Sequence, residues 1–346
     1  MIKTGNKRKA GHILQTARRN PKLANLFWHI LVSIAIFAAL LYYVDASAVA
    51  SSILSSDPVF LLLAFISYAA VNMLMAFRMH SLLTAMKSAI PFRQVLSSHY
   101  LGMLASDFTP ARAGYFASAF SLNAKGVPLS RAISAILAPQ TFDFLLKAGA
   151  SAVAIVFLAT YLGLPNAALL PAIAAIIVIF AFVLIIVSLL FIPKLSKPFL
   201  PYLKLLPFGG KIKFMAEKMH ENAPLMRAKL PLIGFILAST WILKGMEWYM
   251  LSLALGMKAN YPVHPFLFFL FLQPIATIVQ FIPTPTPAGA GLSEAGTVGI
   301  MALFGANPPV AAAFGILARA LMLSQDWIGL FEWKNLRLDF LDEKKW

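Results

Sequence analysis

The sequence predicts an all-α, polytopic membrane protein with about six full transmembrane helices, two re-entrant or broken-helix hairpins and an inverted internal repeat. Its 346 residues are 60% hydrophobic and 12% charged, with a mean hydropathy of +0.78, which lies far outside the averages of soluble proteins. Six apolar segments have close to the roughly 20 residues that span the hydrocarbon of a bilayer. The predicted spans are 24–43, 58–77, 140–163, 166–192, 231–256 and 308–331.

The charges that flank these spans orient the chain. Segment 1–23 is a basic lead and not a cleavable signal, because the first apolar run has full spanning length. Most Lys and Arg lie in this segment, in the loop 193–230 and in the tail 332–346, whereas Lys258 is the single basic residue outside. Because positive residues stay on the cytoplasmic side, we expect both termini to be cytoplasmic and the protein to lie in the plasma membrane. The net charge of +16 is then explained without a nucleic-acid partner.

Four further apolar segments do not cross as ordinary spans: three are too short or too broken, and the fourth is long enough but is interrupted at its end. Segments 94–108 and 111–124 are each well short of a span, and so is 288–304, whereas 262–283 runs directly into a proline-rich stretch. We expect the first two segments to form a hairpin that re-enters from the cytoplasm, and the last two a hairpin that re-enters from outside. Two full crossings in place of either hairpin would leave the loop charges unchanged, so charge counting does not decide between these forms.

The two interruptions resemble each other. Residues 109–114 read TPARAG and residues 286–291 read TPAGAG, and in each half a Gly and a Pro follow before the next long helix. Interrupted segments at corresponding positions of two halves point to the central binding site of a transporter. The half-helix after each break directs its positive end at the break, which favours an anion such as phosphate. The predicted repeats are about 58–163 and about 231–331 within one domain, 24–331.

Charged residues at membrane depth are the main candidates for the site, because each costs about 2.5–3.5 kcal/mol at the bilayer centre. Arg112 is interpreted either as a two-point ligand for a headgroup phosphate or as an orientation charge that reaches the cytoplasmic interface. Lys244 and Glu247 lie in mid-span, where an internal salt bridge is favoured. Glu294 is expected to pair with Arg319 or to exchange a proton near the second break. The predicted substrate-binding set is Asp107, Arg112, Gly114, Asp143, Lys147, Lys244, Glu247, Gly289, Gly291, Glu294 and Arg319.

Asp143 and Lys147 are four residues apart and can pair on one face of a helix. Because the predicted span begins at residue 140, they fall near its cytoplasmic end. We therefore expect an ordinary surface pair there.

The sequence argues against an enzyme. It contains no cysteine, and its six histidines are scattered without the spacing of metal ligands, so neither a metal site nor another cofactor is expected. The stretch GLSEA at 291–295 has Ala where the G-x-S-x-G motif needs its second Gly. We expect no catalytic residues.

Two blocks of sequence are similar to a known family. FTPARAGYFASAFSLNAKGVPLSRAISAILAPQTFDFLL (108–146) and IPTPTPAGAGLSEAGTVGIMALFGANPPVAAAFGILARAL (282–321) resemble the paired signatures of the lysylphosphatidylglycerol synthase transmembrane family. Its members are flippase-like integral membrane proteins, some of them fused to a soluble synthase domain, and we expect the membrane region without that domain here. In the first block Tyr115 replaces an acidic residue and Pro139-Gln140 replace an E-R pair. The second block resembles the family pattern at Pro287, Gly289, Gly291, Glu294, Ala295 and Arg319.

The resemblance implies a role in lipid translocation or in lipid-linked chemistry. The leading hypothesis is a flippase-like protein that binds or translocates an anionic phospholipid or a polyprenyl-phosphate-linked lipid. One alternative is a non-transporting scaffold that binds lipid for a separate lipid-modifying enzyme, and another is a small-solute secondary transporter. The expected partners are membrane lipids, with a homo-oligomer or a lipid-modifying enzyme as further partners and no nucleic acid.

Overall fold

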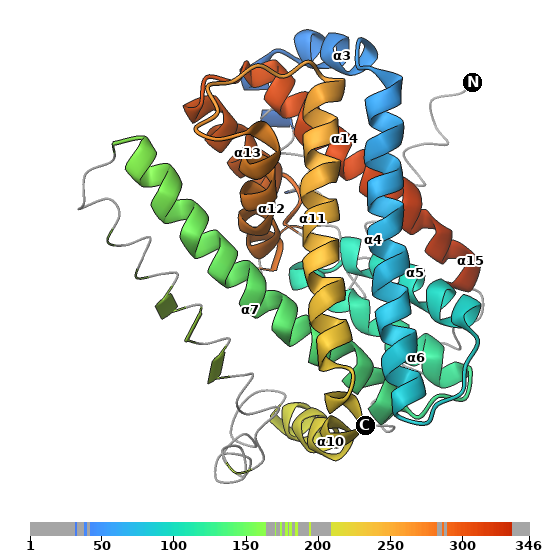
Figure 1. Cartoon of the computed structure of the whole chain (residues 1–346). Coiled ribbons are helices and arrows are strands. Elements are labelled where there is room, and N and C mark those ends of the chain that lie inside the picture. The colour runs from blue at the N-terminus through green and yellow to red at the C-terminus, as the bar shows by residue number, and fades with distance from the viewer. Residues whose placement is uncertain are drawn as a thin grey trace, which may run out of the picture.

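The structure of the chain is helical throughout the part that it describes. The computed structural model describes residues 42–163, 209–281, 286 and 289–333, with isolated positions between 32 and 39 and between 170 and 194. Every regular element in these ranges is a helix, and none of them is a strand (Figure 1). The all-α prediction is therefore confirmed. The predicted spans 24–43 and 166–192 lie almost wholly outside the described residues.

Three long apolar helices form the frame of the molecule. α4 (Pro58–Ala85), α7 (Leu129–Tyr161) and α11 (Leu230–Ala254) are each long and apolar enough to cross a membrane. α4 and α11 lie side by side along most of their length, whereas α7 is inclined to them (Figure 1). Asp57 caps the start of α4 by accepting a hydrogen bond from the backbone N–H of Val59 at 2.8 Å, and Pro58 occupies the first turn, where its missing N–H costs nothing.

The segment predicted as the last span is divided in the structure. α14 (Pro308–Asp326) is followed by a 3₁₀ turn, η4 (Trp327–Gly329), and by the short helix α15 (Leu330–Trp333). α14 is not among the described helices that qualify as spans by length and hydropathy. Two leading prolines, an arginine and a glutamine lower its hydropathy.

Two hairpins of shorter helices pack against the frame. The first consists of α5 (Phe92–Asp107), η1 (Pro110–Phe116) and α6 (Ala117–Ala124), and the second of α12 (Pro265–Phe281) and α13 (Leu292–Leu303). They lie at opposite ends of the long helices, the first in the lower and the second in the upper half of Figure 1. Each of these helices is shorter than the roughly 20 residues of a span. This arrangement agrees with hairpins that enter from opposite faces.

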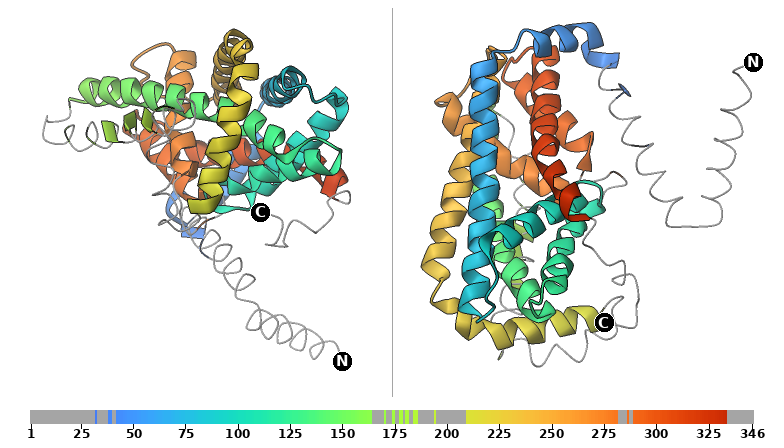
Figure 2. Two further views of the ribbon diagram at one scale, coloured as in Figure 1. Left: turned by 90° about the horizontal axis from the view of Figure 1, so that it is seen from below. Right: turned by 90° about the vertical axis from the view of Figure 1, so that its right-hand side faces the viewer.

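Helices of each half of the repeat pack on helices of the other half. α12 of the second half packs on α7 of the first, and α5 of the first half packs on α14 of the second. Two further helices, α3 (Ala46–Leu54) and α10 (Gly209–Arg227), lie crosswise at the two opposite ends of the frame (Figure 2). α10 falls within the basic loop that the sequence places in the cytoplasm.

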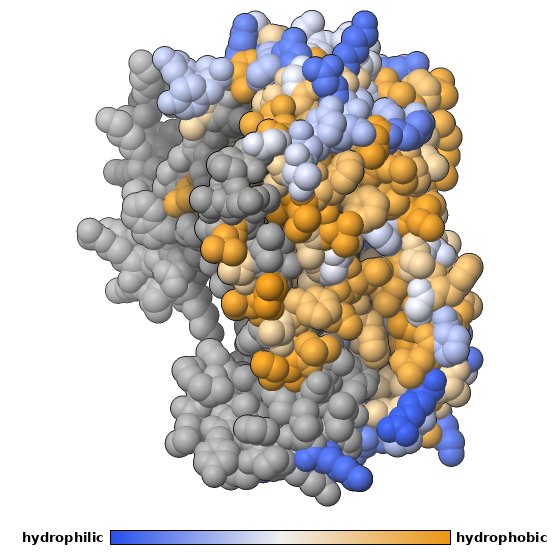
Figure 3. All heavy atoms as spheres, turned by 60° about the vertical axis from the view of Figure 1, so that its left-hand side comes forward, coloured by the Kyte–Doolittle hydropathy of each residue, from blue (hydrophilic) through white to orange (hydrophobic). Residues whose placement is uncertain are grey.

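The surface has the polarity of a membrane protein. A broad apolar band crosses the described part of the face in Figure 3, between two hydrophilic ends. α4 contributes to the exposed apolar surface along its length, and a water-soluble monomer rarely exposes so large an apolar area. Its most exposed large apolar side chains include Val59, Leu62, Ile66, Met73 and Phe77.

The two breaks have the same backbone turn. The N–H of Arg112 donates to the carbonyl of Thr109 at 3.2 Å, and the N–H of Gly289 donates to the carbonyl of Thr286 at 3.3 Å. Arg112 has φ 54° and Gly289 has φ 68°, both in the left-handed region. The matched sequences TPAR and TPAG therefore adopt matched conformations, which supports the predicted repeat.

The correspondence continues downstream of the breaks. α6 and α13 are each followed by a glycine in the left-handed region, Gly126 with φ 91° and Gly305 with φ 77°. In both halves the residue after this glycine donates its N–H to the carbonyl five residues earlier, at 3.1 Å. This is the Schellman ending of a helix, which needs glycine because other residues are strained at a positive φ.

Candidate functional site

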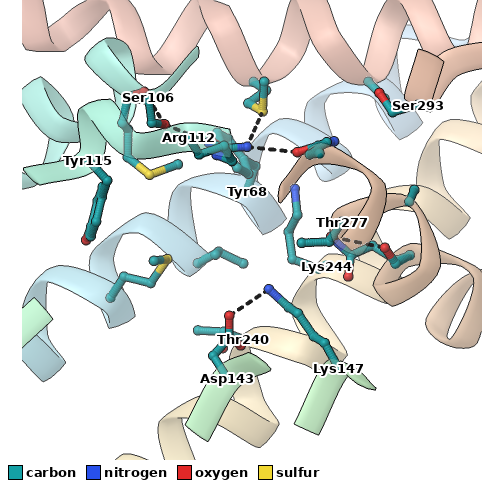
Figure 4. A pocket seen from close by; sticks show the side chains of 18 of the residues that line it. Tyr68, Ser106, Arg112, Tyr115, Asp143, Lys147, Thr240, Lys244, Thr277 and Ser293 are labelled. Carbon is teal, nitrogen blue, oxygen red and sulfur yellow. Dashed lines mark hydrogen bonds and ion pairs between the residues drawn. The ribbon is translucent and has the colours of Figure 1, made fainter. Parts of the chain in front are cut away.

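A cavity of about 370 Å³ lies where the two hairpins meet the frame. Its walls come from α4, α5, η1, α7, α11, α12, α13 and α14, so both halves of the repeat contribute. Figure 4 shows Arg112 from η1, Lys244 from α11 and the pair of Asp143 and Lys147 from α7 around the same space. The predicted site residues that line the cavity are Arg112, Asp143, Lys147, Lys244, Glu247, Glu294 and Arg319.

Arg112 joins the first break to the second hairpin. Its guanidinium donates from Nη1 to Oε1 of Gln280 on α12 at 2.9 Å and from Nη2 to Oγ of Ser106 at 3.0 Å. Nη2 also lies 3.3 Å from Oδ1 of Asp107. Arg112 therefore points into the cavity and does not reach out to the cytoplasmic interface, which corrects the second of the two interpretations made from the sequence.

Glu294 organises the second break. Its Oε1 accepts a hydrogen bond from Nε of Arg319 at 2.6 Å, so the predicted pair is present. Its Oε2 accepts from the N–H of Gly291 at 2.7 Å and from the hydroxyl of Ser293 at 3.0 Å. The carboxylate thus caps the first turn of α13 while it lines the cavity.

Asp143 and Lys147 lie in the middle of a helix, which corrects the prediction of a surface pair. α7 begins at Leu129 and continues through Pro139. A proline usually ends a helix in water, but a membrane helix tolerates one in its interior. The Nζ of Lys147 lies 2.8 Å from Oδ2 of Asp143, with the two side chains 17% and 15% exposed. The pair faces the cavity.

Lys244 and Glu247 form the salt bridge that the sequence predicts in the middle of α11. The Nζ of Lys244 lies 2.6 Å from Oε2 of Glu247 and 4.4 Å from the centre of the Tyr68 ring on α4. The cation therefore interacts with both a carboxylate and an aromatic face.

The remaining predicted residues shape the breaks without lining the cavity. Asp107 lies beside it and reaches it only through Arg112. Gly114 allows η1 to approach α5, because a Cβ at this position would lie 2.2 Å from the carbonyl oxygen of Ala105. Gly289 and Gly291 supply the positive φ angles of the second break.

Sequence reasoning missed Arg78, because the predicted span 58–77 ends one residue before it. α4 continues to Ala85, so Arg78 lies inside this helix, where it is 5% exposed and lines the cavity. Within the described residues it forms no ion pair, and its Nε has no hydrogen-bond partner. The apolar run MHSLL directly after Arg78 is the signal that could have placed it inside the span.

Two positions that depart from the family pattern also line the cavity. Tyr115 replaces an acidic residue of that pattern, and its hydroxyl lies 2.9 Å from Nδ1 of His99. Gln140 stands within the replaced E-R pair.

The charges that line the cavity are unequal. Five lining side chains are cationic and three are carboxylates. Each of the other four cations forms an ion pair with a carboxylate. Arg78 forms none with the described residues, and Asp143, which already pairs with Lys147, attracts it only from a greater distance. A buried space with excess positive charge favours an anion. The cations are Arg78, Arg112, Lys147, Lys244 and Arg319, and the carboxylates are Asp143, Glu247 and Glu294.

Comparison with known proteins agrees with the resemblance noted in the sequence. Residues 30–325 match the family described as the lysylphosphatidylglycerol synthase TM region. The matched range contains both breaks and every residue that lines the cavity. A comparison with curated proteins gave no match.

Proposed function

We propose the function of this chain from the premise that it belongs to the lysylphosphatidylglycerol synthase transmembrane family. It is a polytopic membrane protein, and its family indicates a lipid-related function. We infer that the cavity binds the headgroup of an anionic phospholipid or of a polyprenyl-phosphate-linked lipid and passes it between the two leaflets of the bilayer.

The unpaired Arg78 is the observation that carries this proposal. A buried charge without a partner costs several kcal/mol, so a site that retains one is suited to a ligand that supplies the opposite charge. A guanidinium binds phosphate oxygens with two parallel hydrogen bonds. Arg112, on a neighbouring wall of the cavity, offers a second guanidinium.

The architecture around the cavity supports movement as well as binding. The cavity volume of about 370 Å³ lies within the roughly 300–1,000 Å³ of small-molecule sites. Hairpins from opposite ends of the molecule meet at the cavity, and transporters with broken helices place their substrate between two such halves. We propose that the protein is a transporter and not an enzyme.

The location and orientation are part of the same proposal. The predominance of Lys and Arg in the N-terminal segment, in the loop that contains α10 and in the tail supports cytoplasmic termini in the plasma membrane. The partner that the proposed function requires is the membrane lipid.

Reconstitution in liposomes tests the proposal. The vesicles contain headgroup-labelled phosphatidylglycerol, or in a second series a labelled polyprenyl phosphate, and an impermeant reagent quenches the outer leaflet. We expect the protein to expose inner-leaflet label to the reagent. Equal protection with and without protein in both series would overturn translocation, and lipid that co-purifies with the protein without being moved would favour the scaffold.

A further inference from the structure

Two buried carboxyl groups meet beside the cavity. Asp107 is the last residue of α5 and Asp326 the last residue of α14, and their carboxyl groups lie within hydrogen-bonding reach of each other. Asp107 is 5% exposed and Asp326 is fully buried. Two carboxylates in contact at such a depth cannot both be ionised, because the like charges repel each other without solvent to screen them.

The hydrogen-bond donors around this pair are too few for two carboxylates. The hydroxyl of Tyr68 lies 3.2 Å from Oδ1 and 3.0 Å from Oδ2 of Asp326, and Arg112 reaches Oδ1 of Asp107 at 3.3 Å. Oδ2 of Asp107 is buried, and neither a backbone group nor another side chain of the described residues donates to it. A hydrogen bond between the two carboxyl groups therefore requires a proton that one of them carries.

The surroundings of the pair connect it to the cavity. Of the cations that interact with it, Arg112 makes a direct contact and is also a cavity wall residue. Lys244 and Arg319 act from a greater distance and already have the carboxylate partners Glu247 and Glu294. The titratable and charged groups that face the pair are Tyr68 of α4, Tyr100 of α5, Arg112 and Tyr115 of η1, Lys244 of α11 and Arg319 of α14.

We propose that Asp107 and Asp326 form a proton-binding site that is linked through Arg112 to the anion site, so that an anionic headgroup and a proton bind together. The inference rests on the proposed function. In the empty protein the pair shares one proton, and its remaining negative charge holds Arg112. An anion in the cavity draws Arg112 away from Asp107, and the pair, having lost its counter-ion, takes up a second proton. By reciprocity, a protonated pair releases Arg112 and strengthens anion binding.

This assignment differs from the one that the sequence suggested. The sequence left Glu294 either as the partner of Arg319 or as a carboxylate that exchanges a proton, and in the structure it accepts hydrogen bonds from Arg319, Ser293 and the backbone of Gly291. These donors hold Glu294 in the ion pair and in the cap of α13. The pair of Asp107 and Asp326 has fewer donors, and its two carboxyl groups face each other.

Titration of a short-chain phosphatidylglycerol into the purified full-length protein tests the linkage. Binding heats measured in two buffers of different ionisation enthalpy give both the affinity and the number of protons taken up. We expect uptake of up to one proton by the native protein, and an affinity that rises up to about tenfold for each unit of decrease in pH. Asp107→Asn and Asp326→Asn are expected to bind without proton uptake and with little pH dependence. Glu221→Gln, which removes an exposed carboxylate on α10, is the matched control and should retain the uptake.

The outcomes separate the two proposals. Lipid binding by the native protein without proton uptake would overturn the linkage and leave the proposed function standing, whereas a failure to bind any anionic lipid would contradict the proposed function. Infrared difference spectra of the lipid-free protein examine the shared proton directly. We expect the band of a protonated carboxyl group, lost in both Asn variants, and its absence from the native protein would also overturn the inference.

Discussion

Arg112 occupies a backbone position that its counterpart in the second break fills with Gly289. Both residues have a positive φ and the same hydrogen bond to a threonine carbonyl. A left-handed conformation costs a side-chain-bearing residue about 1–2 kcal/mol, whereas glycine adopts it freely. The first break therefore retains a strained residue whose side chain reaches the cavity, as functional sites often do.

This comparison predicts a difference between two variants at position 112. Arg112→Gly and Arg112→Ala both remove the guanidinium, but only glycine relieves the backbone strain. We expect the Gly variant to be more stable than the Ala variant by about 1 kcal/mol, measured by thermal or denaturant unfolding, and both to lose lipid movement equally. Equal stabilities would show that the turn is not strained at this residue.

At Arg78 we expect a substitution to weaken lipid binding without lowering the stability of the fold. Arg78→Met keeps the volume of the side chain and removes a buried charge that has no carboxylate partner in the described structure. We expect an unchanged or higher melting temperature, because a buried charge without an ion-pair contact is unfavourable. The affinity for anionic lipid should fall about tenfold or more, since charge-assisted hydrogen bonds contribute about 1.5–3 kcal/mol.

The control for this variant is Lys258→Met, which removes a basic residue in the exposed loop after α11. It should leave lipid affinity unchanged. Unchanged affinity in Arg78→Met itself would remove the main support for an anion in the cavity.

At the scale of elements, Glu294 connects α13 to α14 and fixes the turn between α12 and α13. Glu294→Gln leaves Arg319 buried without its counter-charge, so we expect a loss of stability of about 3–5 kcal/mol in unfolding experiments. The double variant with Arg319→Met should recover most of that loss. A double variant as unstable as the single one would show that the capping of α13, and not the ion pair, is the dominant contribution.

The short helix α15 is anchored by a pH-sensitive contact. Oε1 of Glu332 lies 2.7 Å from Nζ of Lys125 at the end of α6. Burial alone would raise the pKa of Glu332, but hydrogen bonds from Lys125 and Ser97 outweigh it and lower the pKa below its ordinary value of 4.5. A lowered pKa means that the ionised form stabilises the fold above pH 4.5 and that this contribution is lost as the pH falls through the lowered value.

The corresponding measurement compares native protein with Glu332→Gln. We expect the variant to have the lower melting temperature at neutral pH and the difference to disappear in acid. A difference that persists well below the lowered pKa would assign the anchor to packing and not to charge.

At the scale of the whole molecule, the hairpins are expected to open to opposite faces of the membrane. The chain contains no cysteine, so a thiol reagent labels only the single cysteine that is introduced, and the side from which it reacts shows where that residue is exposed. We expect Ala124→Cys, at the end of α6, to react with impermeant maleimide only from the cytoplasm, and Ala302→Cys, in the last turn of α13, only from outside. Labelling of both from the same side would contradict the inverted arrangement.

Hydropathy and local motifs predict much of this architecture. Long apolar runs identify α4, α7 and α11, because a span has to be apolar throughout, and the TP-small-AG motifs locate both breaks, because proline and glycine interrupt helices. Charges inside apolar runs stand out for the same reason, which is why so many predicted site residues line the cavity.

The errors also have physical causes. Arg78 was missed because the charge itself truncates the apolar run at residue 77, although the helix continues to Ala85. Asp143 and Lys147 were misplaced because Pro139 looks like a helix start, whereas a membrane helix tolerates an internal proline. The contact of Asp107 with Asp326 joins residues far apart in the chain, and no local pattern predicts it.

The hydrogen bond between Arg112 and Gln280 ties together two hairpins that are expected to be rooted in different leaflets. A change in bilayer thickness is therefore expected to act on this contact, because membrane proteins accommodate hydrophobic mismatch by tilting or kinking their helices. Short acyl chains would press the hairpins together, and long ones would draw them apart. The protein should then respond to the length of the lipids around it as well as to the charge of the lipid that it holds.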